Sequence, residues 1–490
     1  MLKGKIMNFN SFEYLLFLPI TVILYFILPR KIKNPTLLVA SYFFYMRWNP
    51  VYALLMLFST AVTYFCSILV DKEALGRRKT WVAASLVINL AILFFFKYYN
   101  FVATSVTDLF AFLKVGASLP TLNILLPVGI SFYTFQALGY TIDVYRKNIQ
   151  CEKNFLDYAL FVSFFPQLVA GPIERTGNIV PQLKVHHKFS FANLRDGFLL
   201  ILWGLMKKMI IADNLAIVVN NVYNNPTAHT GAQLAFATLC FAFQIYCDFS
   251  AYTDIARGSS KIIGIGLCAN FKCPYAADSI KDFWRRWHIS LSSWFKDYLY
   301  FPLGGSRVSK GRHIFNVMTV FFVSGIWHGA AFTYIIWGVL HGLYQAVGIL
   351  STPLREKFYK LVPKNNPILK GAKILGTFCL VCFAWILFRA NSLSDAFYII
   401  EKIFSAPVDG ILPLAFGALG LSTKALCAVF IFVVILMVVD VVNLKYPVAK
   451  SICNTIFVKY AVFFLLLISI VIFGYYGEGF DPQEFVYFQF

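Results

Sequence analysis

The sequence predicts an all-α protein that crosses a membrane many times, and three observations support this prediction. Hydrophobic residues make up 59% of the 490-residue chain, charged residues make up only 13%, and phenylalanine alone occurs 52 times. A soluble domain cannot bury that much apolar surface, so lipid must cover much of it. Apolar runs of helical length recur along the chain. We expect about 11–13 transmembrane helices in a single integral-membrane domain over residues 1–490.

The apolar runs place the expected helices along the chain. Several of them are shorter than the roughly 20 residues that a straight span needs, and two further runs, 36–46 and 315–326, are shorter still. Short runs indicate re-entrant or partly buried helices. The segments expected to span lie near 12–29, 50–70, 81–96, 121–142, 155–170, 197–219, 232–256, 331–350, 372–389, 426–443 and 459–475.

Turn signals separate some of these helices. Arg47-Trp48-Asn49-Pro50 predicts a tight turn, because proline disfavours helix in the residue before it. Pro166, Gly171 and Pro172 predict a helix break at apparent membrane depth. No small-residue cleavage site follows the first apolar run, so we expect that run to be a retained span.

The distribution of charged residues predicts how the chain is oriented in the membrane. The net charge of +20 comes from 43 basic against 23 acidic residues, and the basic residues lie mostly in short loops. Such loops fix orientation and meet anionic headgroups. Loops 30–33 and 71–79 predict a cytoplasmic side, which makes the N-terminus external. The basic clusters have no soluble domain to present them, so no nucleic-acid partner is expected.

Most of the ten cysteines lie in or beside apolar segments, which indicates packing. Cys379 and Cys382 form a C-x-x-C, but within an apolar helical run. Small apolar packing residues explain this pattern, so we expect neither a metal site nor a disulfide framework.

Polar side chains recur at helical spacing inside several apolar runs. They share one face in each of two sets, which are Gln136, Tyr140 and Asp143, and then Gln244, Asp248 and Tyr252. Asp254 and Arg257 stand three residues apart and predict an internal ion pair. Charged groups within a span normally face a protein-lined or watery interior. For Asp248, the residues alone leave internal hydrogen bonding and a functional role equally open.

His328 lies between Trp327 and Gly329 inside an apolar run. A lone histidine there is more often structural, yet an ionisable group in a membrane is a functional candidate. Neutral imidazole can accept a proton near physiological pH. Gly325 and Gly329 also predict a face of little bulk that a slender substrate can approach. These arguments leave both roles open.

His288 falls in a basic, aromatic run. Trp284, His288 and Ser292 share one face of a predicted continuous interfacial helix with aromatic anchors. Arg285 and Arg286 lie on other faces and suit either lipid phosphates or an anionic acyl donor. We expect ordinary structural roles for the remaining histidines, His186, His187, His229, His313 and His341.

The order of these blocks resembles the membrane-bound O-acyltransferase superfamily, most closely its bacterial branch for alginate O-acetylation. The blocks are D-F-W-R-R-W-H-I-S-L-S-x-W from Asp282, D-Y-L-Y-x-P-L-G-G from Asp297 and S-G-x-W-H-G from Ser324. The likeness covers nearly the whole chain, and several ordered blocks make it specific. Further matches lie at 10–19, 170–175, 247–257, 383–390 and 487–490.

The resemblance implies roles for particular residues. His328 matches the superfamily's catalytic histidine, and His288 matches its second signature position. We expect His328 to act as general base and His288 to polarise the donor carbonyl. The expected substrate-binding residues are Trp287, Trp327, Asp248, Gln244 and Arg285.

The resemblance also implies an architecture and a reaction. Many helices would surround a central funnel in a bacterial cell membrane. An acyl group, expected to be acetyl, would pass from a cytoplasmic thioester such as acetyl-CoA to an extracellular or envelope polysaccharide. Transfer would be direct or through a periplasmic or extracellular relay or esterase-like protein, with no bound cofactor.

Three alternatives stay open at this point. In the first alternative, the enzyme transfers the acyl group to teichoic acid, a lipid or a protein. In the second, His328, Asp248 and Asp254 form the relay of a proton-coupled transporter. In the third, the chain is a non-catalytic structural subunit. The ordered blocks and the lack of an evident internal repeat count against a transporter.

Overall fold

The computed structural model confirms an all-α membrane protein. It describes residues 7–73, 75–169, 171–363, 366–405, 419–445, 455–477 and 485, and within these it contains helices and no β-strand. Ala170 and the closing segment 487–490, both parts of the sequence matches, lie outside the described residues. Among the described residues, seven helices are long and apolar enough to cross a membrane: Pro50–Lys72, Gly76–Phe112, Gly231–Ile263, Phe332–Leu350, Pro367–Arg389, Thr423–Leu444 and Ile456–Phe473.

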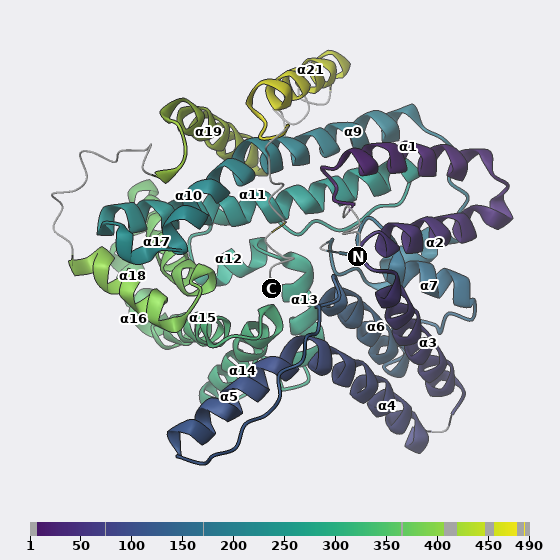
Figure 1. Ribbon diagram of the computed structural model, residues 1–490, viewed down its shortest axis with the longest axis horizontal. Coiled ribbons are helices and arrows are strands. Elements are labelled where there is room, and N and C mark those ends of the chain that lie inside the picture. Colours follow the sequence, from purple (N-terminus) through teal and green to yellow (C-terminus); the bar gives the residue numbers. More distant parts are fainter. Residues whose placement is uncertain are drawn as a thin grey trace. The chain divides into compact units, whose positions relative to one another are not determined.

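The chain forms two compact units, and the first comprises Met1–Ile201 and Tyr252–Cys268. Helices α3, α4 and α6 lie side by side in it (Figure 1) and pack against one another. Helices α1 and α2 form a further contacting pair. The helices that lie wholly in this unit are α1 (Phe12–Ile27), α2 (Arg30–Met46), α3 (Pro50–Lys72), α4 (Leu75–Leu93), α5 (Tyr99–Phe112), α6 (Ile130–Tyr145), α7 (Phe155–Ser163) and α8 (Thr176–Leu183).

Turn chemistry sets several boundaries in the first unit. The predicted turn before Pro50 is confirmed, because α2 ends at Met46 and the Asn49 side chain caps α3 by accepting a hydrogen bond from the Val51 amide at 2.9 Å. The break predicted around Pro166 is also confirmed, since α7 ends at Ser163. The prediction of a helix from residue 121 was wrong. The chain has no helix over 113–129, where Pro120 and Pro127 stand, and α6 begins at Ile130.

The predicted Asp254–Arg257 ion pair is confirmed in the first unit. The Arg257 guanidinium donates to an Asp254 carboxylate oxygen at 3.3 Å. Tyr140 is buried, and its hydroxyl accepts a hydrogen bond from the Glu152 amide at 2.8 Å. These three side chains therefore pair with other polar groups of the protein.

The second unit comprises Leu202–Ala251 and Ala269–Phe490, and it holds every residue predicted for the catalytic site. Two helices contribute residues to both units, α9 (Phe191–Met206) and α11 (Gly231–Ile263). The other main helices of the second unit are α10 (Asp213–Tyr223), α12 (Ile280–Arg286), α13 (Ile289–Phe295), α14 (Lys310–His328), α15 (Phe332–Leu350), α16 (Thr352–Leu361), α17 (Pro367–Arg389), α18 (Leu393–Ser405), α19 (Thr423–Lys445) and α21 (Ile456–Phe473). Short helical turns complete the second unit, namely the π-helical turns η2 (Lys207–Ala212) and η5 (Lys296–Tyr300) and the 3₁₀ turns η3 (Pro226–Ala228) and η4 (Pro274–Ala276). A further π-helical turn, η1 (Phe94–Tyr98), lies in the first unit.

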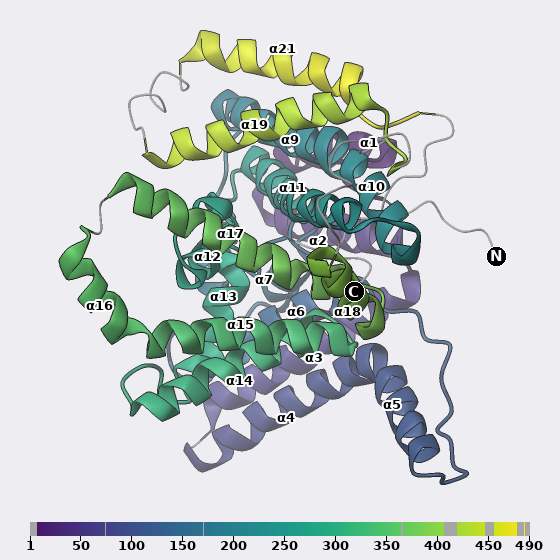
Figure 2. The same ribbon diagram turned by 90° about the vertical axis from the view of Figure 1, so that its left-hand side faces the viewer.

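Helices α14 and α15 lie side by side along much of their length (Figure 2). Glycines make this approach close. A β-carbon on Gly325 would stand 2.5 Å from the Tyr334 carbonyl oxygen, and one on Gly338 would collide with the Phe321 carbonyl oxygen. Small residues let helix backbones approach in this way within membranes. The contact fixes the end of α14, where His328 lies.

This packing makes a stability prediction. Gly338→Ala would place a methyl group against the backbone of α14 and should lower the free energy of unfolding by about 1–3 kcal/mol, as overpacking does. The measurement is the thermal unfolding midpoint of the purified protein in detergent. Gly348→Ala, in the same helix, is the matched control because nothing lies within 4 Å of its added β-carbon. Equal midpoints for the two variants would contradict the proposed backbone contact.

Candidate active site

His328 is the last residue of α14, and its side chain is only 4% exposed. Three aromatic rings surround the imidazole, with ring centroids 5.0 Å away for Trp327, 4.9 Å for Trp337 and 5.4 Å for Phe388. All three rings stand roughly perpendicular to it, which restricts its orientation. The rings come from α14, α15 and α17, so the packing of three helices positions this histidine.

The expectation that glycines beside His328 leave room for a substrate was wrong. Helix α15 occupies that space: its backbone lies against Gly325, and the Tyr334 ring covers Gly329 so closely that a β-carbon there would collide with it. Gly325 allows α14 and α15 to pack closely, and Gly329 leaves room for the Tyr334 ring just after α14 ends.

His288 lies at a break between two short helices, so the predicted continuous interfacial helix was also wrong. Helix α12 ends at Arg286, Trp287 is extended, and His288 has φ 44° and ψ 55° before α13 begins. A left-handed conformation is unusual for a residue with a β-carbon and is typical of functional sites. Trp287 and His288 are 2% and 0% exposed, so they lie inside the protein and not at an interface.

A neighbouring loop supports the backbone at this break. The Lys272 amide donates to the Arg286 carbonyl at 2.9 Å, and the Ile289 amide donates to the Asn270 carbonyl at 2.9 Å. The buried Asn270 side chain also accepts from the Ser290 amide at 3.2 Å. These bonds satisfy groups that two helix ends would otherwise leave unpaired, which offsets the cost of the unusual conformation.

Trp327 joins the two histidines. Its ring centroid lies 6.0 Å from that of His288 and 5.0 Å from that of His328. On another side, His288 meets the Phe249 ring of α11 at 4.7 Å. The structure therefore brings together residues from the two sequence blocks, separated by forty positions, within one buried cluster.

Sequence reasoning missed other members of this cluster. Trp385 lies 5.1 Å from Trp287 and stacks on Trp337 with 6.0 Å between centroids. His341 belongs to it too, since its Nδ1 accepts a hydrogen bond from Trp284 Nε1 at 3.3 Å and its ring lies 5.0 Å from Trp337. Helical spacing carried the signal, because Trp337 and His341 stand four residues apart on one face. We name this set the histidine–tryptophan cluster: Trp284, Trp287, His288, Trp327, His328, Trp337, His341, Trp385 and Phe388.

Asp248 takes part in a buried ionic network. The Lys208 ammonium lies 2.7 Å from an Asp248 oxygen and 2.9 Å from an Asp213 oxygen, and all three side chains are at most 3% exposed. The Phe485 ring covers the same ammonium, with its centroid 4.2 Å from Nζ. Next in the chain, Lys207 donates to the Ser250 hydroxyl at 2.8 Å. Asp248 is adjacent on α11 to Phe249, whose ring touches His288.

The other two predicted residues differ in exposure. Gln244 is 6% exposed, and its buried Oε1 has no hydrogen-bond partner among the described residues. Arg285 is exposed on α12 and lies outside the cluster. Its neighbour Arg286 is committed to Asp282, with 2.7 Å between Nε and the carboxylate.

Comparison with known proteins identifies the family of this chain. The family model for membrane-bound O-acyltransferases matches residues 151–389, which contain both histidines. The chain is 37% identical over 408 residues to a probable alginate O-acetylase of Pseudomonas aeruginosa, covering 81% of this chain and 75% of that protein.

Two further relatives carry different names. A peptidoglycan O-acetyltransferase of Helicobacter pylori is 35% identical over 459 residues, covering 87% of this chain and 82% of the relative. A teichoic acid D-alanyltransferase of Bacillus subtilis is 33% identical over 288 residues, covering 56% of this chain and 71% of the relative. The buried histidines, the apolar helices and these similarities lead to one conclusion: the chain belongs to the membrane-bound O-acyltransferase family and is a multi-pass membrane enzyme.

Proposed function

We propose that this enzyme transfers an acetyl group from a thioester donor on the cytoplasmic side of a bacterial cell membrane to hydroxyl groups of an extracellular or envelope polysaccharide. The observation that carries the proposal is the pairing of His288 and His328 across the Trp327 ring in a buried cluster. Relatives named for O-acetylation of alginate and of peptidoglycan support acetyl as the acyl group.

His328 is the proposed general base. Its imidazole takes the proton of the acceptor hydroxyl while the hydroxyl oxygen attacks the thioester carbonyl carbon. The new C–O bond forms, the C–S bond breaks, and the thiolate leaves and recovers a proton. His328 is the last residue of α14, where the negative end of the helix dipole stabilises the imidazolium that this step creates. A base so placed contributes about 10²–10⁴-fold to the rate.

His288 is the proposed electrophilic partner. A donor N–H aimed at the thioester carbonyl stabilises the negative charge that develops on its oxygen. The hydrogen-bonded break between α12 and α13 holds the imidazole before substrate binds, so little reorganisation is needed at the reaction. Trp287 and Trp327 exclude water from the two histidines.

The remaining predicted residues, Gln244, Asp248 and Arg285, have different proposed roles. Gln244 presents a buried oxygen with capacity for a hydrogen bond from a substrate hydroxyl or amide. Asp248 acts through Lys208, because its carboxylate is committed to that ammonium. Arg285 is exposed, which suits an anionic donor or a lipid phosphate at the protein surface.

The acceptor and the path to it complete the proposal. The acetyl group crosses through the funnel that the family implies and reaches the polymer directly or through a periplasmic or extracellular relay or esterase-like protein. The D-alanyltransferase relative favours teichoic acid as the second candidate acceptor. Both acceptors offer hydroxyl groups, so the same step at His328 serves either one.

Replacement of His328 tests the catalytic role. His328→Gln should lower O-acetyl ester in the envelope polysaccharide about 10²–10⁴-fold, because glutamine fills similar space without a basic nitrogen. The measurement is ester content per mass of polysaccharide, in cells whose membrane levels of the enzyme are matched to wild type.

His341→Gln is the matched control, since it makes the same change to another buried histidine of the cluster. Its ester content should stay well above that of His328→Gln at equal protein level. If both acetyl ester and D-alanyl ester are unchanged in His328→Gln, the proposed role is wrong. Loss of D-alanyl ester with unchanged acetyl ester would assign teichoic acid as acceptor.

A second pair of variants separates Gln244 from Asp248. Asp248→Asn removes one carboxylate from the Lys208 network and should destabilise the protein by about 3–5 kcal/mol, seen as a lower unfolding midpoint. Gln244→Ala should leave the midpoint near wild type and lower ester formation. If Asp248→Asn unfolds like wild type but needs a higher donor concentration, Asp248 binds substrate directly.

A further inference from the structure

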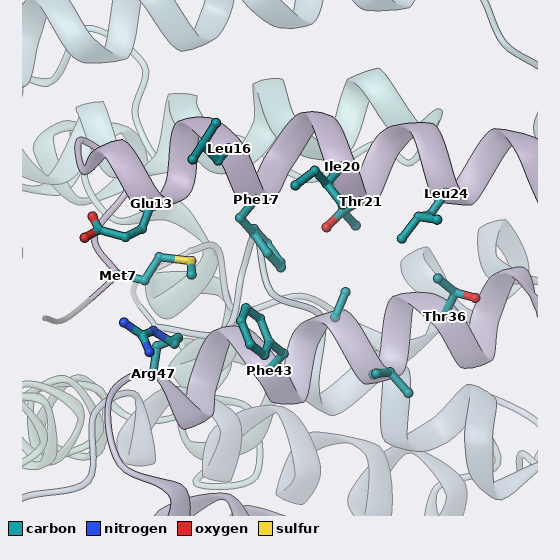
Figure 3. A pocket seen from close by; sticks show the side chains of 12 residues that line it. Met7, Glu13, Leu16, Phe17, Ile20, Thr21, Leu24, Thr36, Phe43 and Arg47 are labelled. Carbon is teal, nitrogen blue, oxygen red and sulfur yellow. The ribbon is translucent and has the colours of Figure 1, made fainter. Parts of the chain in front are cut away.

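An apolar groove runs between α1 and α2 in the first unit, and none of the residues assigned to the reaction lines it. It encloses about 530 Å³, within the range of small-molecule sites in proteins, which is about 300–1,000 Å³. Phe17 of α1 stacks on Phe43 of α2 with 6.1 Å between centroids (Figure 3). The lining residues are Met7, Glu13, Leu16, Phe17, Ile20, Thr21, Leu24, Thr36, Val39, Ala40, Phe43 and Arg47.

Two opposite charges lie at one end of this apolar groove. Figure 3 shows Glu13 of α1 and Arg47, which follows α2, at the same end, with the Met7 side chain between them. Neither charged side chain has a hydrogen-bond or ion-pair partner among the described residues. Glu13 lies in the first turn of α1 and Arg47 caps α2, so each charge complements its helix end. The helix dipoles account for the sign of each charge, but they do not explain why both charged side chains line the same groove.

The dimensions of the groove match one leaflet of a bilayer. Its lining on α1 runs from Glu13 to Leu24, about 16 Å along the axis at about 1.5 Å per residue. That is about half of the roughly 30 Å hydrocarbon core. Trp48, next to Arg47, adds an amphipathic ring of the kind that marks the headgroup level. The charged end therefore suits a headgroup and the apolar length suits one acyl chain.

We propose that this groove binds a phosphatidylethanolamine molecule. Its phosphate accepts charge-assisted hydrogen bonds from Arg47, its ammonium group donates to Glu13, and an acyl chain lies between Phe17 and Thr36. An anionic headgroup without an amine leaves Glu13 beside negative charge, and a choline headgroup has no N–H to donate. The charge pattern thus favours ethanolamine over both glycerol and choline headgroups.

The test is lipid retention by the full-length protein. The protein is purified in detergent, given equal concentrations of phosphatidylethanolamine, phosphatidylglycerol and phosphatidylcholine, and examined by native mass spectrometry. Wild type should retain phosphatidylethanolamine in preference to the other two. Arg47→Gln should weaken this retention about tenfold, as expected for loss of a hydrogen bond to a charged group. Glu13→Gln should remove the preference over phosphatidylglycerol.

Matched controls separate the groove from general lipid contact. Arg77→Gln removes a basic charge elsewhere in the first unit, on a side chain that is 79% exposed, and should leave retention unchanged. Ala40→Trp fills the groove and should abolish retention of all three lipids, whereas Leu54→Trp on the exposed face of α3 should not. Equal retention of the three lipids by wild type, or no effect of Arg47→Gln and Ala40→Trp, overturns the proposal. Stoichiometric capture of a protein helix in place of lipid overturns it as well.

Discussion

The close backbone contact between α14 and α15 is the constraint on which the candidate active site depends. Gly325 and Gly338 allow it, and any larger side chain at either position would meet a carbonyl oxygen of the facing helix. The contact brings Trp337 of α15 against His328 of α14 with 4.9 Å between ring centroids. In a membrane, where lipid tails are as apolar as the helices, such packing supplies much of the energy that holds helices together. Van der Waals packing of α14 against α15 therefore sets the positions of Trp337 and His328 in the candidate site.

The second constraint is the break at His288. A continuous helix would carry His288 on a regular face, whereas the left-handed backbone between α12 and α13 redirects its side chain towards Phe249 and Trp327. The bonds from Asn270 and Lys272 hold this conformation in the absence of substrate. Pre-organisation of this kind lowers the reorganisation that a transition state requires.

Sequence patterns predicted the helices and both histidines but not how they meet. Composition and apolar runs suffice for an all-α membrane chain, and Pro50 and Pro166 locate helix boundaries because proline acts locally. Periodicity failed at His288, since hydrogen bonds from a loop sixteen or more residues earlier override the amphipathic pattern. The sequence pattern also misled at the glycines near His328. A helix face without side-chain bulk can pack closely against another helix or admit a substrate, and the sequence does not distinguish the two. Trp385 was missed because only tertiary contact places it beside Trp287 and Trp337. His341 was missed although its spacing from Trp337 places both residues on one helix face.

The distribution of charge in the second unit bears on the proposed role of His328 as a general base. Lys208 lies between Asp213 and Asp248, so its ammonium offsets part of the charge of the two carboxylates. His328 is bordered by the rings of Trp327 and Trp337, which stand roughly perpendicular to the imidazole. In the proposed mechanism, the carbonyl end of α14 would stabilise the imidazolium that forms on His328.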